Sequence, residues 1–389
     1  MSLYFWLKDL LSRPSSSLSA RAALWPAAGL AWLYGRALAA RRWAYERRLV
    51  GRYRAPVPVI SVGNLASGGT GKTPCVDTVC RILLEGGYRP AVLSRGYGGT
   101  YRGSWAAVSE GGPPLLTVEE AGDEPVLLAR SLPTVPVLIG KNRSVAARAA
   151  VERYAAQVLV LDDAFQHLRM ERDLDLVTMD AKYPLGNGHC LPRGLLRETP
   201  GALRSVDLVL LTRAERLPPE ALEHSRGEVR AHTPRAPILA ATHAPVHVTD
   251  VNRGTRESLE RLVGRKVLAF AGIGWPAAFF AELENLGARV LEAVPFPDHH
   301  PYSRDDLEKL AHWAKLMNAE AVVTTDKDAV RLSDRLPLDA PLFSLGIELV
   351  LLEGEALFRE AVLGVARCGA GPAVRALLRP PLSFPGSIS

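Results

Sequence analysis

The sequence predicts an α/β protein in which a doubly wound parallel sheet is followed by a second, smaller α/β domain and preceded by an N-terminal membrane-associating helix. Short apolar segments alternate with helical segments from residue 56 onward. A Gly-rich segment ending in Gly71-Lys72-Thr73 follows the first of these apolar segments, and basic and aromatic residues are concentrated in residues 1–55. Strands and helices that alternate in this way are typical of a parallel sheet covered by helices on both faces.

The composition is that of a globular protein with a full hydrophobic core. The chain has 389 residues, of which 48% are hydrophobic and 23% are charged, so most of it is not intrinsically disordered. At roughly 150 residues per domain, this length predicts two domains. The four cysteines form no CxxC pair, which argues against a disulfide scaffold or a zinc ribbon and favours a reducing, cytosolic environment.

The net charge of +6 comes entirely from the N-terminal segment. Residues 1–55 contain ten Lys or Arg against Asp9 and Glu46, whereas the other 334 residues carry 37 basic and 39 acidic groups. A nucleic-acid-binding protein usually spreads its basic surface over the folded domain. We therefore expect no nucleic-acid partner.

The same segment contains a helix that we expect to lie on a membrane surface. Residues 22–35 carry no charge, but fourteen residues are too few for a span, which needs about 20. Trp25, Trp32 and Tyr34 lie in this run and arginines flank it, a composition typical of an interfacial helix attracted by anionic lipids. A helix packed on the domain and a true span over residues 22–40 are the alternatives. A signal peptide fits poorly, because no cleavage pattern follows.

From residue 56 to residue 237 the pattern predicts the larger α/β domain. Its expected strands end in Gly-rich or acidic segments, and each is followed by a loop or a helix. The expected strands cover residues 57–62, 90–94, 135–139 and 157–161, and the expected helices cover residues 72–86, 123–132 and 142–155. Residues 100–118 resemble a β-rich excursion.

A turn-rich region at residues 233–237 predicts a domain boundary. Beyond it, residues 266–271, 288–294 and 320–325 are apolar enough for strands and are separated by helical segments. Residues 238–366 are therefore expected to form the smaller C-terminal α/β domain. The Pro-rich residues 367–389 predict a disordered tail.

The segment from Gly63 to Thr73 has the character of a phosphate-binding loop (P-loop). It connects an expected strand to an expected helix, so its backbone N–H groups and the helix N-terminus can face phosphate oxygens. Lys72 would reach the β- and γ-phosphates of ATP and Thr73 would offer a hydroxyl to Mg²⁺. The nucleotide-binding residues are expected to be Gly68, Gly69, Thr70, Gly71, Lys72 and Thr73. The first Gly of the usual pattern is replaced by Ala66, and a plain Gly-rich turn is the alternative.

Three further acidic residues and a histidine can each be interpreted in two ways. Asp162 and Asp163 end the most apolar expected strand; beside a phosphate loop they would hold Mg²⁺, whereas alone they would begin a turn or cap a helix. Asp123 precedes a helix and could simply cap it. His299 lies between Asp298 and His300 and could be a polar loop residue, or a base for phosphoryl transfer beside a carboxylate.

Taken together, these stretches resemble the tetraacyldisaccharide 4′-kinase family, the lipid A 4′-kinases of Gram-negative bacteria. The matching pieces run in family order over about residues 20–335: Gly63-Asn64 with Gly68-Gly69-Thr70-Gly71-Lys72-Thr73-Pro74, Leu93-Ser94-Arg95-Gly96-Tyr97-Gly98, Gly122-Asp123-Glu124-Pro125, Asp162-Asp163-x-Phe165-Gln166-His167, Arg172-Asp173-Leu174-Asp175, Leu196-Arg197-Glu198, Asp298-His299 and Thr325-x-Lys327-Asp328-Ala329-Val330. The chain departs from the family's usual pattern at Ala164 and at Arg193.

The resemblance implies a reaction and a place for it. The reaction is ATP-dependent phosphorylation of the 4′-hydroxyl of a tetraacylated glucosamine disaccharide 1-phosphate, an anionic acylated lipid, at the cytoplasmic face of the inner membrane. Asp123 is implied to act as the base, with His299 as its partner in a dyad contributed across the two domains. Arg197 is implied to clamp a phosphate, and Asp162, Asp163 and Glu198 to manage Mg²⁺.

Two other classes compete with the kinase. A membrane-bound ATPase switch has a similar phosphate loop, but it carries a lysine before the paired glycines, where this chain has Ser67. A non-catalytic nucleotide-binding scaffold is the second alternative, and the presence of Lys72, Thr73 and Asp162 argues against it.

Overall fold

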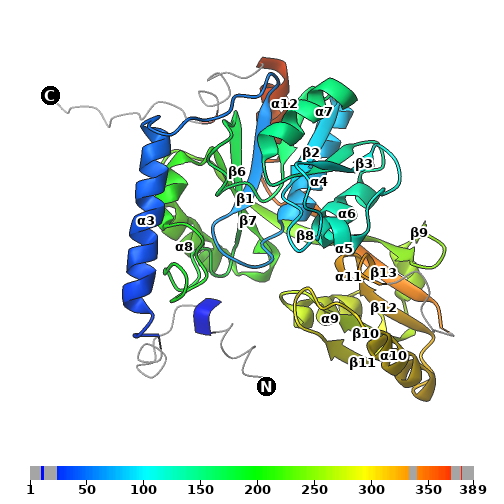
Figure 1. Ribbon diagram of the computed structural model, residues 1–389. Coiled ribbons are helices and arrows are strands. Elements are labelled where there is room, and N and C mark those ends of the chain that lie inside the picture. Colours follow the sequence, from blue (N-terminus) through cyan, green and yellow to red (C-terminus); the bar gives the residue numbers. More distant parts are fainter. Residues whose placement is uncertain (1–9, 13–23, 333–339, 369–377, 379–389) are drawn as a thin grey trace.

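The computed structural model describes residues 10–12, 24–332, 340–368 and 378 (Figure 1). Nearly all of the tail predicted over residues 367–389 lies outside these residues. The described strands form one mixed sheet in the order β11-β10-β12-β13-β8-β7-β6-β1-β5-β2-β4-β3, with β9 paired to β8. This large, mainly parallel sheet confirms the predicted α/β class.

The strands are β1 (Val59–Asn64), β2 (Pro90–Ser94), β3 (Ala106–Glu110), β4 (Pro136–Ile139), β5 (Val158–Leu161), β6 (Leu174–Asp180), β7 (Leu208–Thr212), β8 (Ile238–Asp250), β9 (Thr255–Glu257), β10 (Lys266–Ala271), β11 (Arg289–Pro295), β12 (Ala321–Thr325) and β13 (Leu342–Leu351). The helices are α3 (Ala28–Glu46), α4 (Lys72–Glu85), α5 (Val118–Ala121), α6 (Asp123–Ser131), α7 (Arg143–Tyr154), α8 (Pro219–Arg230), α9 (Pro276–Asn285), α10 (Arg304–Leu316), α11 (Asp326–Ala329) and α12 (Glu355–Cys368).

The central strands explain where a site can form. β1 pairs in parallel with both β5 and β6, and β2 pairs in parallel with β5 and β4. Every residue of β1, β2 and β5 is buried, because helices cover both faces of a parallel sheet. The carboxyl ends of β1, β5, β2 and β4 therefore meet at one edge, where the chain turns into loops and helices.

Figure 1 shows a large lobe and a small lobe joined through two long strands. The small lobe contains β9 to β12 with α9, α10 and α11. β8 and β13 pair antiparallel over most of their length; β8 also pairs with β7 through Ile238 to Ala240. The two lobes are thus connected by continuous hydrogen-bonded sheet.

The lobes do not follow the boundary predicted after residue 237. The first residues of β8 still belong to the sheet of the large lobe. In addition, α12 returns to the large lobe, where Phe358 and Val362 share a hydrophobic core with Val76 and Leu83 of α4. The predicted 238–366 unit therefore mixes segments of both lobes.

Helix α3 lies along the outside of the large lobe (Figure 1). Its inward side consists of Ala31, Gly35 and Arg42, which are buried. Arg42 donates to Glu198 Oε2 at 3.4 Å and to Ser205 Oγ at 3.0 Å, and its guanidinium lies 4.8 Å from the centre of the Phe165 ring. These contacts hold the helix on the lobe.

The outward side of the same region carries large apolar side chains. Trp25, Leu30, Trp32, Leu33 and Trp43 are all exposed. In the part of the chain that the structure describes, no helix is both long enough and apolar enough to cross a membrane.

Candidate active site

The segment between β1 and α4 is held close to the sheet. Gly71 has a φ of 82° and caps α4, and a Cβ at this position would lie 2.2 Å from His243 Nε2. Only glycine fits both the left-handed backbone and the close approach. Thr212 Oγ1 donates to the Thr70 carbonyl at 3.1 Å, and the Thr70 hydroxyl lies 2.9 Å from that of Thr178. The loop is therefore held in place by side chains of β6, β7 and β8.

Cations gather beside this loop. Lys72, the first residue of α4, places Nζ 3.8 Å from Asp163 Oδ1. Arg197 Nη1 donates to both Asp163 oxygens, at 2.9 and 3.1 Å, and to Asn64 Oδ1 at 3.2 Å. Burial would raise the pKa of Asp163, but the charges of Lys72 and Arg197 lower it below the usual range. Asp163 is thus an ionised partner of two cations.

Asp162 has a different environment. It is fully buried at the end of β5; Ser94 Oγ donates to its Oδ2 at 3.0 Å, and its Oδ1 has no hydrogen-bond partner in the structure. Burial, reinforced by the negative charges of Glu124 and Asp163, raises the pKa of Asp162 to about 7. A buried carboxylate oxygen without a partner is costly, so this position is suited to a cation.

Asp123 and His299 meet across the two lobes. Asp123 is the first residue of α6, and its Oδ2 lies 2.8 Å from His299 Nδ1. Arg331 donates to the same oxygen from Nε at 3.0 Å and from Nη2 at 2.6 Å. Burial would raise the pKa of Asp123, but the hydrogen bond with His299 and the charges of Lys327 and Arg331 hold it well below the usual range.

The small-lobe side of this contact is an ordered cluster. His299 has a φ of 61° and its N–H donates to the Gly272 carbonyl at 3.2 Å. Lys327 Nζ lies 3.4 Å from His299 Nε2, 3.7 Å from Asp298 Oδ1 and 3.8 Å from Glu124 Oε1. A non-glycine residue in the left-handed region stores local strain that the surrounding structure must balance, and such residues cluster at functional sites.

Comparison with known proteins identifies the family. The sequence matches the family described as tetraacyldisaccharide-1-P 4′-kinase (LpxK) over residues 20–366. The chain belongs to this family. A tetraacyldisaccharide 4′-kinase from Syntrophus aciditrophicus is 44% identical over 331 residues, which is 84% of this chain and 88% of the relative. One from Anaeromyxobacter dehalogenans (strain 2CP-C) is 49% identical over 302 residues, 77% of this chain and 79% of the relative.

A solved structure agrees with the sequence comparison. The crystal structure of LpxK from Aquifex aeolicus in complex with ATP superposes with a TM-score of 0.72 at 30% identity, covering 88% of this chain and 99% of that one. These findings confirm the family resemblance and the prediction that the chain is a phosphotransferase. The chain is therefore a kinase, as the description of its family states.

One residue predicted as a metal ligand of this kinase family lies elsewhere. The buried Glu198 carboxylate contacts the guanidinium groups of Arg41, at 3.9 Å, and Arg42, at 3.4 Å. Among the described residues, no group of three or more His, Cys, Asp or Glu side chains is placed to hold a metal ion. The predicted set of Asp162, Asp163 and Glu198 is therefore not assembled, because Glu198 anchors α3.

Arg331 and Glu124 are among the residues of the site that were not given a role from the sequence. Arg331 contacts Asp123 directly. The Glu124 carboxylate lies 3.8 Å from Lys327 Nζ, and its negative charge contributes to the raised pKa of Asp162. Glu124 directly follows Asp123, and Arg331 follows the matching segment that ends at Val330. The proximity of each to a family motif was the available signal.

Proposed function

We propose that this chain catalyses the reaction for which its family is named. ATP phosphorylates the 4′-hydroxyl of tetraacyldisaccharide 1-phosphate, giving the 4′-phosphorylated lipid A precursor (lipid IVA) and ADP. The observation that carries the proposal is the contact between Asp123 and His299, which lies at the same sheet edge as Lys72 and Asp162. An acceptor held at this contact would face the terminal phosphate of a nucleotide at the β1–α4 loop.

The nucleotide phosphates are proposed to bind at the loop of Gly68 to Thr73. Backbone N–H groups at the start of α4, with the partial positive charge of the helix N-terminus, suit an anion. Lys72 would contact the terminal phosphates and Arg197 would neutralise charge that develops during transfer. In the structure, Asp163 is the ion-pair partner of both cations.

The residues beside this loop fit Mg²⁺. Asp162 offers a buried oxygen without a hydrogen-bond partner, and oxygen donors are those that Mg²⁺ prefers. Asp162, with Asp163 and the Thr73 hydroxyl, would hold the ion. When bound, Mg²⁺ neutralises charge on the phosphates during transfer.

The Asp123–His299 pair is proposed to take the proton from the acceptor hydroxyl. A carboxylate whose pKa is held low by Arg331 and Lys327 is a weak base by itself. Sharing the proton with an imidazole 2.8 Å away removes that limitation. Arg331 would keep Asp123 in place while the hydroxyl attacks.

The acceptor brings the enzyme to a membrane. Each CH₂ group of an acyl chain is worth about 0.8 kcal/mol when buried, so a tetraacylated lipid does not leave the bilayer. We propose that α3 binds the membrane surface peripherally through its exposed aromatic residues and its arginines, at the cytoplasmic face of the inner membrane, where ATP is present.

The decisive experiment is transfer of labelled γ-phosphate from Mg-ATP to tetraacyldisaccharide 1-phosphate in detergent micelles. We expect product with the wild type and none with Lys72→Ala. Asp123→Asn and His299→Gln should each lose about 10²–10⁴-fold in kcat while ATP binding persists, and the exposed His312→Gln should serve as a neutral control. ATP hydrolysis stimulated by anionic vesicles without lipid product would instead support the membrane ATPase switch.

A further inference from the structure

The imidazole of His299 is in contact at both of its nitrogens. Nδ1 lies 2.8 Å from Asp123 Oδ2, and Nε2 lies 3.4 Å from the ammonium nitrogen of Lys327. The side chain of His299 is 43% exposed, so water reaches the ring and burial does not decide which nitrogen carries a proton. The proposed chemistry uses the contact at Nδ1 and gives the contact at Nε2 no role.

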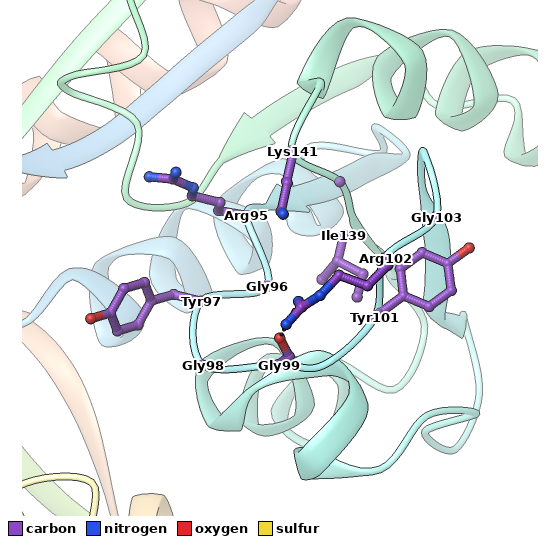
Figure 2. Close-up of a pocket in the computed structure, with 11 residues that line it drawn as sticks. Arg95, Gly96, Tyr97, Gly98, Gly99, Tyr101, Arg102, Gly103, Ile139 and Lys141 are labelled. Atoms are coloured by element: carbon purple, nitrogen blue, oxygen red, sulfur yellow. Dashed lines mark hydrogen bonds between the residues drawn. The ribbon is translucent and has the colours of Figure 1, made fainter.

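The large-lobe side of this contact is fixed by the loop after β2. Figure 2 shows the course of this loop over residues 95–103. A Cβ on Gly122 would lie 2.3 Å from the Tyr97 carbonyl, so the residue before Asp123 packs directly against the loop. Asp123 Oδ1 accepts a hydrogen bond from the Glu124 N–H at 2.9 Å. The carboxylate is therefore held in place, and the small-lobe side must supply a matching imidazole.

The partner of Nδ1 accepts a hydrogen bond and cannot donate one. Burial would raise the pKa of Asp123, but the hydrogen bond with His299 and the charges of Lys327 and Arg331 hold it well below the usual range. An ionised carboxylate has acceptor oxygens and no donor. Nδ1 of His299 must therefore carry a proton and donate it to Asp123 Oδ2.

The partner of Nε2 has the opposite character. An ammonium group has three N–H donors and no acceptor, so Lys327 Nζ can only donate to this nitrogen. A proton on Nε2 would point at that ammonium, while the carboxylate oxygen Oδ1 of Asp298 is 3.9 Å away, beyond the length of a hydrogen bond. His299 is therefore a neutral ring whose one proton is on Nδ1.

Lys327 is itself held by two carboxylates. Its Nζ lies 3.7 Å from Asp298 Oδ1 and 3.8 Å from Glu124 Oε1. These carboxylates complement the ammonium charge and leave one of its N–H groups for Nε2. The charged groups around the imidazole come from both lobes: Asp123 and Glu124 of α6, Asp298 beside the ring, Lys327 of α11, and Arg331 just after α11.

We propose that Lys327 is a positioning residue whose ammonium keeps a second proton off Nε2 of His299. The proposal rests on the proposed function, because it concerns the base for the acceptor hydroxyl. The pair of Asp123 and His299 begins with one proton, on Nδ1, and can take up one more. A pair that had already taken this second proton from water could not take it from the hydroxyl. Lys327 thus keeps the pair ready for the acceptor.

The kinetic test compares Lys327→Met with the wild type at two pH values. Without the ammonium, water protonates Nε2 more easily, and low pH favours this protonation. We expect kcat for lipid phosphorylation to fall about tenfold at pH 6.5 and less than about twofold at pH 9, while KM for ATP and for the lipid each stay within about twofold.

Two further variants make the kinetic result specific. Lys327→Arg keeps a cation that has N–H donors and no acceptor, so it should recover part of the activity at pH 6.5. Lys309→Met removes an exposed ammonium from α10 of the same lobe and is the matched control, which should keep the wild-type kcat at both pH values. Thermal melting should show that all three variants are folded.

A spectroscopic arm observes the ring protons directly. In the 389-residue protein labelled with ¹⁵N-histidine, NMR at pH 7.5 should show a protonated Nδ1 and an unprotonated Nε2 for His299. In Lys327→Met, the Nε2 signal should move toward the protonated position. His299→Gln identifies the signals, because it removes them from the spectrum.

Three results would overturn the proposal. These are a protonated Nε2 in the wild type, an Nε2 signal that Lys327→Met does not change, and a loss of kcat that is equal at the two pH values or absent. If the ring protons were as expected but the wild type transferred no phosphate to the lipid, the proposed function would fail while the contact of Lys327 with Nε2 kept its assigned effect. Lipid phosphorylation by a wild type with a protonated Nε2 would leave the proposed function standing and refute the role of Lys327.

Discussion

His243 is the residue on which the loop before α4 rests. Its Nε2 atom is buried without a hydrogen-bond partner in the structure, and this nitrogen limits the space at Gly71. Burial, with the positive charges of Arg213 and Arg216, lowers the pKa of His243 to about 3. The imidazole is therefore neutral in the folded protein at any pH near neutrality.

This shift predicts a loss of stability on acidification. An unfolded histidine has a pKa of about 6.5, so between pH 6.5 and pH 3 the unfolded state binds a proton that folded His243 does not. Stability contributed by the neutral ring is complete above pH 6.5 and falls as the pH decreases. His243→Gln should remove about 2 kcal/mol of the decrease in unfolding free energy between pH 7.5 and pH 5.0, measured by urea denaturation.

His312→Gln, on the exposed face of α10, is the control and should leave the pH dependence unchanged. Burial and nearby arginines also lower the pKa of His167 to about 3. His167 should therefore preserve part of the pH dependence of the unfolding free energy in the His243 variant. A His243 variant with the full wild-type slope would contradict the assignment.

The sequence could suggest the chemistry of single residues but not all of their contacts. Asp123 and His299 are 176 positions apart, and only the family resemblance paired them. Arg331 contributes two donors to the same carboxylate, yet an arginine after a short helix looks like any surface residue. The family resemblance implied that Glu198 is a metal ligand, whereas its neighbours in space, Arg41 and Arg42, are on α3.

At the scale of elements, helix α3 has one side that is anchored to the large lobe and another that exposes large apolar side chains. Its buried residues recur at steps of four and seven, so one stripe of the helix faces the lobe. The exposed surface of the helix includes Trp32 and Leu33, which are 68% and 61% exposed. An apolar stripe left open beside several arginines is what an interfacial helix requires.

We therefore expect Trp32→Glu/Leu33→Glu to weaken binding to phosphatidylglycerol-containing vesicles by at least tenfold, in a sedimentation assay. Each large apolar side chain contributes roughly 1.5–3 kcal/mol when buried, and the added carboxylates are repelled by the anionic surface. Leu316→Glu changes a side chain that is 69% exposed on α10 and should not alter binding. Equal effects of the two variants would exclude α3 as the membrane contact.

Strands whose residues are all buried were easier to predict from the sequence than strands that are partly exposed. β5 is a run of four buried aliphatic residues, which the sequence indicated clearly. β8 has a buried first part and a half-exposed second part, so neither a continuous apolar run nor a strict alternation identified it. The boundary expected near residue 237 failed for the same reason, because β8 belongs to both lobes.

For the whole molecule, the site exists only while the two lobes are together. Asp123 belongs to the large lobe, whereas His299, Lys327 and Arg331 belong to the small lobe. Arg331 also donates to the Gly272 carbonyl at 3.1 Å and to Asp328 at 3.0 Å, so it connects three segments. Among the described residues, the small-lobe side chains that hydrogen-bond to Asp123 are Arg331 and His299. Without the Arg331 guanidinium, the contact with His299 would remain.

Arg331→Ala should consequently loosen the junction of the lobes and impair transfer. We expect kcat for lipid phosphorylation to fall about 10- to 100-fold, because a base that is misplaced by a small distance loses much of its effect. Hydrogen exchange should rise in α11 and at the start of α6. ATP hydrolysed per lipid phosphorylated should increase, since a site that closes poorly admits water.

Two comparisons make this result specific. Arg331→Lys keeps the charge but loses the forked pair of donors, so it should recover only part of the activity. Arg304→Ala removes a side chain that is 90% exposed on α10 and should change neither exchange nor coupling. If Arg331→Ala reduced kcat while exchange and the hydrolysis ratio stayed at wild-type values, Arg331 would act only on the Asp123 charge, and the junction would not depend on it.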